Sequence, residues 1–221
     1  MKVKVLKLMD YSIQELNSET VNIYELSKFI VVENYSHHDA ANEAASMEDE
    51  IRELYTEESM YAKYSKYHIA FDTSNEMIGA IRVMKWNRKQ VLPMQKIFGI
   101  NLLNEINVLS YNSSIWHIGR FAISGSKQRL GITLFKQLLV LALVPLYENI
   151  SDILIAECDC KLVRVLSALG IEVNLLGNPV YYLGSETVPL FLTHKGIVDF
   201  FESHKGLVEL DKKQLTTNAC A

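Results

Sequence analysis

The spacing of apolar residues divides the chain into predicted helices and strands that polar stretches separate. In the first half, these spacings predict a strand, two helices, two further strands and a short helix, over residues 2–9, 22–33, 47–67, 67–71, 77–84 and near 102–106. A polar turn at residues 72–76 separates the two later strands, which predicts an antiparallel hairpin. We therefore expect a sheet with at least one helix packed against it.

The middle of the chain has the pattern of a strand, a loop and a helix. An alternating apolar run at residues 115–123 meets a Ser-Gly-Ser turn, and a strongly apolar helix is predicted over residues 130–144, where Pro145 should end or bend it. Helix N-termini favour negative charge by about 0.3 to 1 kcal/mol at exposed sites, so the loop around Gly131 is suited to a pyrophosphate. An ordinary helix cap is the alternative.

A second apolar strand at residues 152–158 and a helix at residues 161–169, stopped by Gly170, follow this segment. Strand, helix, strand and helix in this order predict a βαβ unit whose two strands are parallel. Three strands and a final helix, which Thr193 could cap, are predicted beyond it, over residues 171–176, 180–183, 188–193 and 195–203. We expect one domain over residues 1–210 and a polar, flexible tail at residues 211–221.

The composition of the chain argues against several classes of binding partner. A net charge of -4 and a pI near 5.9 argue against a nucleic-acid-binding protein. Cys158 and Cys160 are one residue apart and Cys220 is distant, which gives neither a disulfide framework nor a metal-binding pair, so we expect a cytoplasmic protein without a signal peptide. The longest apolar run, residues 138–146, is shorter than a membrane span. The adjacent His, His and Asp at residues 37–39 lack the spacing of a metal site, and no metal is expected.

The loop motif and the order of elements resemble the GCN5-related N-acyltransferase (GNAT) superfamily. Its signature is Gln or Arg, two residues, Gly, one residue, then Gly or Ala, and Gln128, Gly131 and Thr133 occupy its three fixed positions. The resemblance covers about residues 24–193 and implies an α/β (α+β) fold: a mixed, mostly antiparallel central sheet flanked by helices, with a parallel pair around the βαβ unit. It also implies that backbone N–H groups of the strand and loop bind an acyl-thioester donor. The donor-binding residues implied are Phe121, Ala122, Ile123, Lys127, Gln128, Arg129, Leu130, Gly131, Ile132 and Thr133.

A narrower resemblance is to the branch that contains acyl-homoserine lactone synthases and long-chain N-acyl amino acid synthases. Gly79 and Arg82 match the Gly-x-x-Arg strand of that branch. Arg120 and Phe121 match the end of its Glu-x-x-Arg-Phe strand, in which His117 stands in place of the glutamate. The branch takes acyl groups from coenzyme A or acyl carrier protein. The resemblance therefore implies acyl-CoA or acyl-phosphopantetheine as a co-substrate, and acyl carrier protein as an alternative partner.

Acyl transfer to an amine needs a base for the amine and an acid for the leaving thiolate. Imidazole can accept a proton at neutral pH, so His117, which shares a strand face with Phe121 by period-two alternation, is the first candidate base. Glu157 on the neighbouring strand is the second, and a structural His beside a carboxylate is the alternative. Many acetyltransferases of the superfamily use a Tyr acid where this chain has Leu166. Cys158 or a water could serve instead.

Arg82 and Arg120 lie at apolar strand centres, where an unpaired charge is costly. They could bind the carboxylate of an acceptor in bidentate fashion, or pair with acids such as Glu157 or Glu105. Six basic loop residues could dock the 3'-phosphate of coenzyme A or an acidic carrier protein, or be solvated charges: Lys85, Arg88, Lys89, Lys96, Lys127 and Arg129.

The sequence predicts an N-acyltransferase that moves an acyl group from an acyl-CoA or acyl-carrier-protein thioester to the amine of a small acceptor such as an amino acid. The alternative is a catalytically idle module of the same fold, which binds an acyl thioester as a sensor or interaction partner.

Overall fold

The computed structural model describes residues 2–3, 10–37, 44–105, 113–125, 131–182 and 185–210. The chain divides into two compact units, each assembled from separate stretches of sequence. Unit 1 comprises Met1–Met84, Arg120–Ala142 and Lys205–Glu209, and unit 2 comprises Lys85–Gly119, Leu143–His204 and Leu210–Ala221. The single domain over residues 1–210 stays a prediction, and the tail at residues 211–221 lies outside the described residues.

Unit 1 contains an antiparallel series of strands in which each strand pairs with the next. The strands are β1 (Lys2–Val3), β2 (Tyr11–Leu16), β3 (Ser65–Asp72) and β4 (Met77–Lys85). The predicted hairpin is confirmed as β3 and β4, and its pairing begins with Ser65 opposite Met84. Strand β2 was not predicted, since only Tyr11 and Ile13 of its six residues are buried and the alternation is short.

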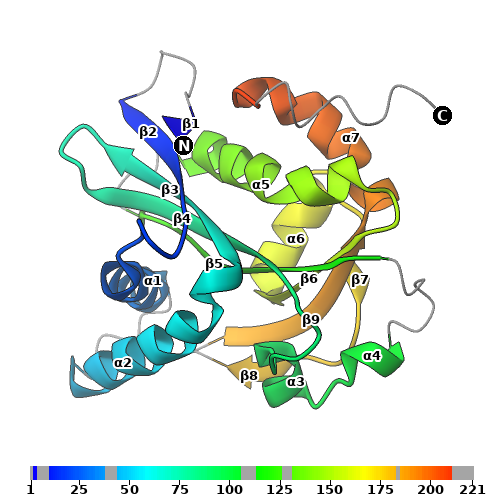
Figure 1. Cartoon of the computed structure of the whole chain (residues 1–221), viewed down its shortest axis with the longest axis horizontal. Helices are drawn as coiled ribbons and strands as arrows, with labels where there is room; N and C mark the ends of the chain where they lie inside the picture. Colours follow the sequence, from blue (N-terminus) through cyan, green and yellow to red (C-terminus); the bar gives the residue numbers. More distant parts are fainter. Residues whose placement is uncertain are drawn as a thin grey trace. The chain divides into compact units, whose positions relative to one another are not determined.

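Two helices of unit 1, α1 (Ile23–His37) and α2 (Ala44–Tyr61), pack against each other (Figure 1). They share an apolar core with β3, β4 and the end of β5, which includes Leu26, Ile30, Ile51, Leu54, Tyr67, Ile69, Ala80 and Ala122. A short 3-10 helix, η1 (Ala62–Tyr64), ends the helical segment before Ser65, so the last residues of the predicted helix belong to strand β3. A second such helix, η3, covers Lys205–Leu207.

Unit 2 holds most of the remaining strands, in the order β5, β6, β9 and β7, with β8 also paired to β9. Their bounds are β5 (Ile115–Ile123), β6 (Ile153–Asp159), β7 (Asn174–Leu175), β8 (Val180–Tyr182) and β9 (Ser185–Thr193). β5 and β6 are parallel, and the other pairs are antiparallel. This confirms the predicted fold class: a mixed, mostly antiparallel α/β fold with one parallel pair around a βαβ unit.

The remaining helices agree with the sequence except at two points: α3 was not predicted, and α5 extends beyond its predicted end. They are α3 (Pro93–Phe98), α4 (Leu102–Glu105), α5 (Gly131–Glu148), α6 (Cys160–Ala168) and α7 (His194–His204). Helix α5 does not end at Pro145 but continues to Glu148, because fully buried Leu146 anchors the last turn and the Asn149 side chain donates to the Pro145 carbonyl oxygen at 3.3 Å, and a bend at Pro145, the other predicted outcome, stays a prediction. Thr193 caps α7 as predicted, accepting the Gly196 N–H on Oγ1 at 3.3 Å.

Among the helices of the described residues, α5 has the length and composition of a membrane span. Its 18 residues are 56% buried within the molecule, and the core helix of a soluble protein has the same length and composition. The prediction that the chain has no membrane span therefore stays a prediction.

Candidate active site

Strand β5 departs from regular strand geometry at Arg120. Its parallel pairing with β6 runs from Ile115 to Ile118 and stops there. Arg120 has a φ of 56°, in the left-handed region that residues other than glycine rarely occupy. Such a residue interrupts the alternation of side chains along the strand. Alternation therefore cannot be used to infer that His117, before Arg120, and Phe121, after it, share a face of the sheet.

The three strand residues that were predicted to bind the donor follow this break. The Phe121 ring packs edge-on against Phe135 of α5, with the ring centroids 5.0 Å apart. Ala122 is buried in the core of unit 1, and Ile123 is half-buried. Directly after the strand, the Ser124 N–H donates to the Ile78 carbonyl oxygen of β4 at 3.0 Å. This segment is thus anchored by a ring contact, by core packing and by a backbone hydrogen bond.

The predicted phosphate-binding loop is described only at its two ends. The Gly125 N–H donates to Oε2 of Glu33 on α1 at 3.0 Å. Lys127, Gln128, Arg129 and Leu130 lie outside the described residues. Helix α5 begins at Gly131, where an added Cβ would meet no atom within 4 Å, and the side chain of Ile132 is exposed. No described residue lies close enough to require a glycine here, and the predicted binding of a phosphate by the N–H groups of Gly131 to Thr133 stays a prediction.

Two arginines and two glutamates form a buried ion cluster within unit 1. Arg82 of β4 is fully buried, and its Nη1 donates to both carboxylate oxygens of Glu58, at 3.3 and 3.1 Å. Arg120 donates from Nε to Glu58 Oε2 at 2.6 Å and from Nη2 to Glu57 Oε2 at 2.5 Å. The Tyr67 hydroxyl donates to Glu58 Oε1 at 2.7 Å. Helix α2 thus supplies two adjacent carboxylates that bind arginines of two strands.

The charges of this cluster stabilise one another. Burial alone would raise the pKa of Glu58, but Arg82 and then Arg120 lower it to about 2. Burial alone would lower the pKa of Arg120, and Glu58 and Glu57 together raise it above its ordinary value. Burial and the Glu58 charge raise the pKa of Tyr67, which stays a neutral donor. Glu58 and Arg120 are therefore ionised and paired with each other throughout the neutral pH range.

Pairing with acids, one of the two roles considered for Arg82 and Arg120, is observed here. The acids include Glu57 and Glu58, which the sequence analysis did not single out. The sequence signal available was two adjacent acids on a predicted helix, a pattern that is common on solvated helix faces. Binding of an acceptor carboxylate by the two arginines stays a prediction.

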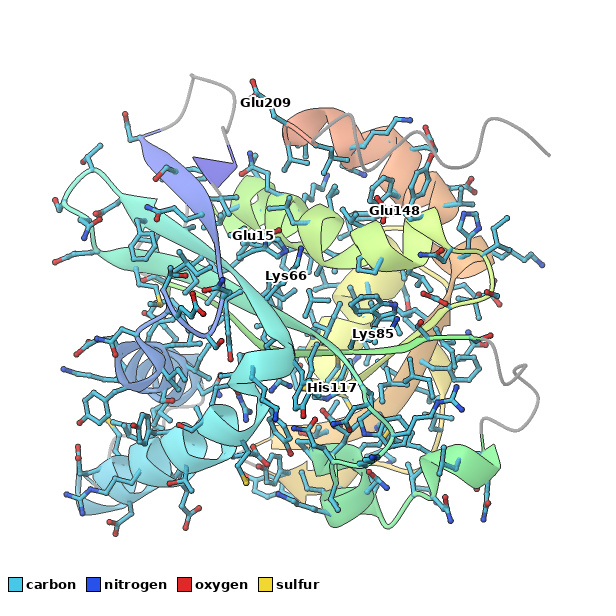
Figure 2. All side chains as sticks on the ribbon, viewed as in Figure 1. Glu15, Lys66, Lys85, His117, Glu148 and Glu209 are labelled. Carbon is cyan, nitrogen blue, oxygen red and sulfur yellow. The ribbon has the colours of Figure 1, made fainter. Side chains whose placement is uncertain are left out.

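A second polar pair lies within unit 2, on the two parallel strands. His117 Nε2 of β5 is 2.8 Å from Glu157 Oε2 of β6. Figure 2 labels His117. The His117 side chain is 1% exposed and that of Glu157 is 11% exposed. In the ladder His117 lies opposite Ile155, two residues before Glu157 on β6. The structure thus brings together the two residues that the sequence offered separately as bases, and the same contact also fits the alternative of a structural His beside a carboxylate.

The remaining catalytic candidate, Cys158, follows Glu157 in the sequence and is buried. Burial, and then the charges of Glu157 and Asp159, raise the pKa of the Cys158 thiol, which is therefore protonated at neutral pH. A thiol with a raised pKa is a weaker acid than an ordinary cysteine, and in its protonated form it is also a poor nucleophile. Leu166, at the position of the superfamily's Tyr acid, is buried in α6. The proton-donor role of Cys158 stays a prediction.

Basic residues that were predicted to dock the donor contact other residues of unit 2. Lys85 Nζ lies 5.7 Å from the centroid of the Trp116 ring, and Arg88 Nη2 donates to the Ser113 carbonyl oxygen at 2.9 Å. Within the described ranges, no group of three or more His, Cys, Asp or Glu side chains is placed to hold a metal ion.

No protein-family model and no curated protein sequence matches this chain. Among solved structures, FeeM, an N-acyl amino acid synthase from uncultured soil microbes, matches with a TM-score of 0.59 and 15% identity over 91% of this chain and 98% of that chain. BjaI, a CoA-dependent acyl-homoserine lactone synthase solved with MTA, matches with a TM-score of 0.57 and 13% identity over 95% and 100%. The AHL synthase LasI matches with a TM-score of 0.54 and 15% identity over 91% and 98%.

This chain has the acyltransferase fold of these synthases. The resemblance to the synthase branch of the GNAT superfamily is thereby confirmed for the fold. At these identities the likeness identifies neither donor nor acceptor. The backbone break at Arg120 and the start of α5 both lie in the segment that was predicted to bind the donor, and donor binding by this segment stays a prediction.

Proposed function

We propose that the protein is an N-acyltransferase that moves an acyl group from a thioester of coenzyme A or acyl carrier protein to the amine of a small acceptor such as an amino acid. The observation that carries the proposal is the His117–Glu157 pair at the end of the parallel β5–β6 ladder. In the synthase branch this strand position holds a glutamate. Here an imidazole takes that position, and a carboxylate from the next strand contacts it.

In the proposed reaction, His117 takes a proton from the incoming amine while the Glu157 carboxylate orients the ring and stabilises its protonated form. The amine nitrogen forms a bond to the thioester carbonyl carbon, and the carbon–sulfur bond then breaks. The thiolate leaves and receives a proton from water, with Cys158, whose pKa burial raises, as the weaker proton donor. Backbone N–H groups of Phe121 to Ile123 stabilise the developing oxyanion, since preorganised donors act most strongly where charge develops.

The donor is proposed to bind with its phosphates at the loop and at the start of α5. The N–H groups of Gly131, Ile132 and Thr133 begin an 18-residue helix, and helix N-termini favour phosphate. The chemistry needs no metal. Cys158 and Cys160 are both free thiols, which supports a reducing compartment, and we place the enzyme in the cytoplasm.

A thiol-release assay with pooled amino acids tests the proposal, using acetyl-CoA, palmitoyl-CoA and acyl carrier protein loaded with the same chains. We expect turnover with at least one donor. The H117A variant should lower kcat by roughly 10² to 10⁴-fold, the usual contribution of a general base. Full turnover by H117A across pH 6 to 9 would remove His117 as the base.

The H117E variant and the double variant H117E/E157Q form a matched pair. H117E places two carboxylates in one buried position, where one of them must stay protonated. H117E/E157Q restores a single carboxylate at the position that the synthase branch uses. We expect the double variant to be more active than H117E. Equal loss in both would exclude this carboxylate as a base.

Buried Leu166 in place of the usual Tyr acid favours a second candidate function, binding of an acyl thioester without turnover. A thermal shift with a donor but no thiol release under any acceptor would support this sensor. No thermal shift with any donor would contradict both functions.

A further inference from the structure

The backbone at Arg120 is in a conformation that its own side-chain chemistry does not favour. A left-handed φ is routine for glycine and tolerated by Asn or Asp, but it is costly for a long side chain and persists only where the surroundings impose it. The residues that follow, Phe121 and Ala122, carry the N–H groups of the proposed oxyanion site. Whatever fixes the conformation of Arg120 therefore also sets the direction of those N–H groups.

The α2 carboxylates hold the far end of the Arg120 side chain. Nε and Nη2 bind two consecutive residues of one helix, Glu58 and Glu57, so the planar guanidinium is fixed in both position and orientation. Glu58 is itself fixed by Arg82 and Tyr67. The Arg120 side chain is only 12% exposed, which protects these bonds from competition with water.

The other end of the same segment is anchored independently. Phe121 packs on Phe135, and the Ser124 N–H is bonded to Ile78. With the side chain of Arg120 fixed at one end and Ser124 at the other, the three residues between them have little freedom. Strain at Arg120 is thus retained by contacts on both sides.

We propose that Glu57, Glu58 and Arg120 form a clamp that holds β5 in its left-handed turn and thereby aims the Phe121 and Ala122 N–H groups at the donor carbonyl. These three are positioning residues, which act through the backbone and touch neither donor nor acceptor. The proposal rests on the proposed acyl-transfer function only for its effect on rate. Its effect on the backbone is independent of that function.

Two double variants with the same charge separate the backbone role from a charge role. E57Q/R120G and E57Q/R120A both remove one positive and one negative charge, so Arg82 and Glu58 remain a balanced pair. The two variants differ only at residue 120, where alanine has one methyl group more than glycine. Glycine adopts the left-handed φ of this position freely, and alanine does not. The clamp predicts that E57Q/R120G is at least about fivefold more active in kcat than E57Q/R120A, with similar KM for the acceptor.

The backbone amide resonances of Phe121 and Ala122, recorded without any ligand, provide a readout that does not depend on activity. They should stay near their wild-type positions in E57Q/R120G and move in E57Q/R120A. The control is E48Q, which removes an exposed charge of the same helix that pairs with Arg52 at 3.5 Å, and which should move neither resonance.

Equal kcat and equal amide positions in the two double variants would overturn the clamp. A rise in acceptor KM in both, with unmoved amides, would show instead that Arg120 binds the acceptor. If wild type shows no turnover with any donor, the acyltransferase function fails while the amide comparison still decides the clamp. If both double variants fail to fold, the single variant E57Q decides it, because unmoved Phe121 and Ala122 amides in E57Q would overturn the proposal.

Discussion

Neutralising Glu58 tests the buried ion cluster most directly. The E58Q substitution keeps the shape of the side chain but removes the charge that accepts from Arg82, Arg120 and Tyr67. Removing one partner from a buried ion pair typically costs about 3 to 5 kcal/mol, because a charge stays buried without its counterpart. The Glu58 side chain is 1% exposed and that of Arg82 is 0% exposed, so water cannot compensate.

The pKa of Glu58 gives an independent magnitude for the same change. A fall from its ordinary 4.5 to about 2 is equivalent to about 3 kcal/mol of preferential stabilisation of the carboxylate in the folded state. Both approaches therefore predict that E58Q lowers the free energy of unfolding at pH 7 by about 3 kcal/mol or more. Urea unfolding followed by circular dichroism measures this, with E48Q as the exposed control, which should change it by less than about 0.5 kcal/mol.

The same change has a defined pH dependence. Because folding depresses the pKa of Glu58, its stabilisation is complete above about pH 4.5 and is lost as the pH falls toward about 2. The difference between wild type and E58Q should therefore be constant from pH 7 to 5 and shrink below. In a double-mutant cycle with R82M, the two changes together should cost at least about 1 kcal/mol less than their sum. A cost below about 1 kcal/mol for E58Q at pH 7, or strict additivity with R82M, would refute a coupled buried cluster.

Two further predictions concern stability elsewhere in the units. Burial lowers the pKa of His68 to about 4, so the unfolded chain binds more protons than the folded chain between about pH 6.5 and 4, and stability is lost as the pH falls through that window; urea titrations should show this slope in wild type and not in H68F. An alanine Cβ at Gly196 would lie 2.9 Å from the Glu172 carbonyl oxygen, so G196A should lower the free energy of unfolding by about 1 to 3 kcal/mol. At Gly206 the space is open, and G206A should leave Tm unchanged or slightly raised.

The elements that the sequence predicts best are those with long periodic patterns. Strand β5 has the predicted bounds, residues 115–123, because alternation persists over its whole length between polar neighbours. Local turn chemistry made two other elements predictable. These are the hairpin of β3 and β4 and the helix α6, which Gly170 ends at a φ of 82°. Strand β2 was missed because half of it lacks a buried face, and its register depends on pairing with β3.

The sequence indicated several individual residues of the site. It did not indicate which residues contact one another. His117 and Glu157 are 40 residues apart, and Arg120 and Glu57 are 63 residues apart, so their contacts depend on how strands and helices pack. The left-handed backbone at Arg120 had no sequence signal, since the residue is neither glycine nor asparagine. Tertiary contacts impose that conformation, and local propensity cannot reveal contacts between residues so far apart.

The pairing of the arginines has a consequence for the acceptor. Arg82 is fully buried and Arg120 already donates to two carboxylates from Nε and Nη2, so an acceptor carboxylate that bound at either of these atoms would have to displace Glu57 or Glu58. Displacement would leave a buried glutamate without its partner, at a cost that exceeds the gain from one new ion pair. We therefore expect recognition of the amine and of the uncharged part of the acceptor, and an amino acid methyl ester or amide should react with a kcat/KM within about threefold of the free amino acid. A loss of 100-fold or more on esterification, together with an equal KM for ester and acid in R120G, would show that Arg120 gives up its helix partners to bind the substrate.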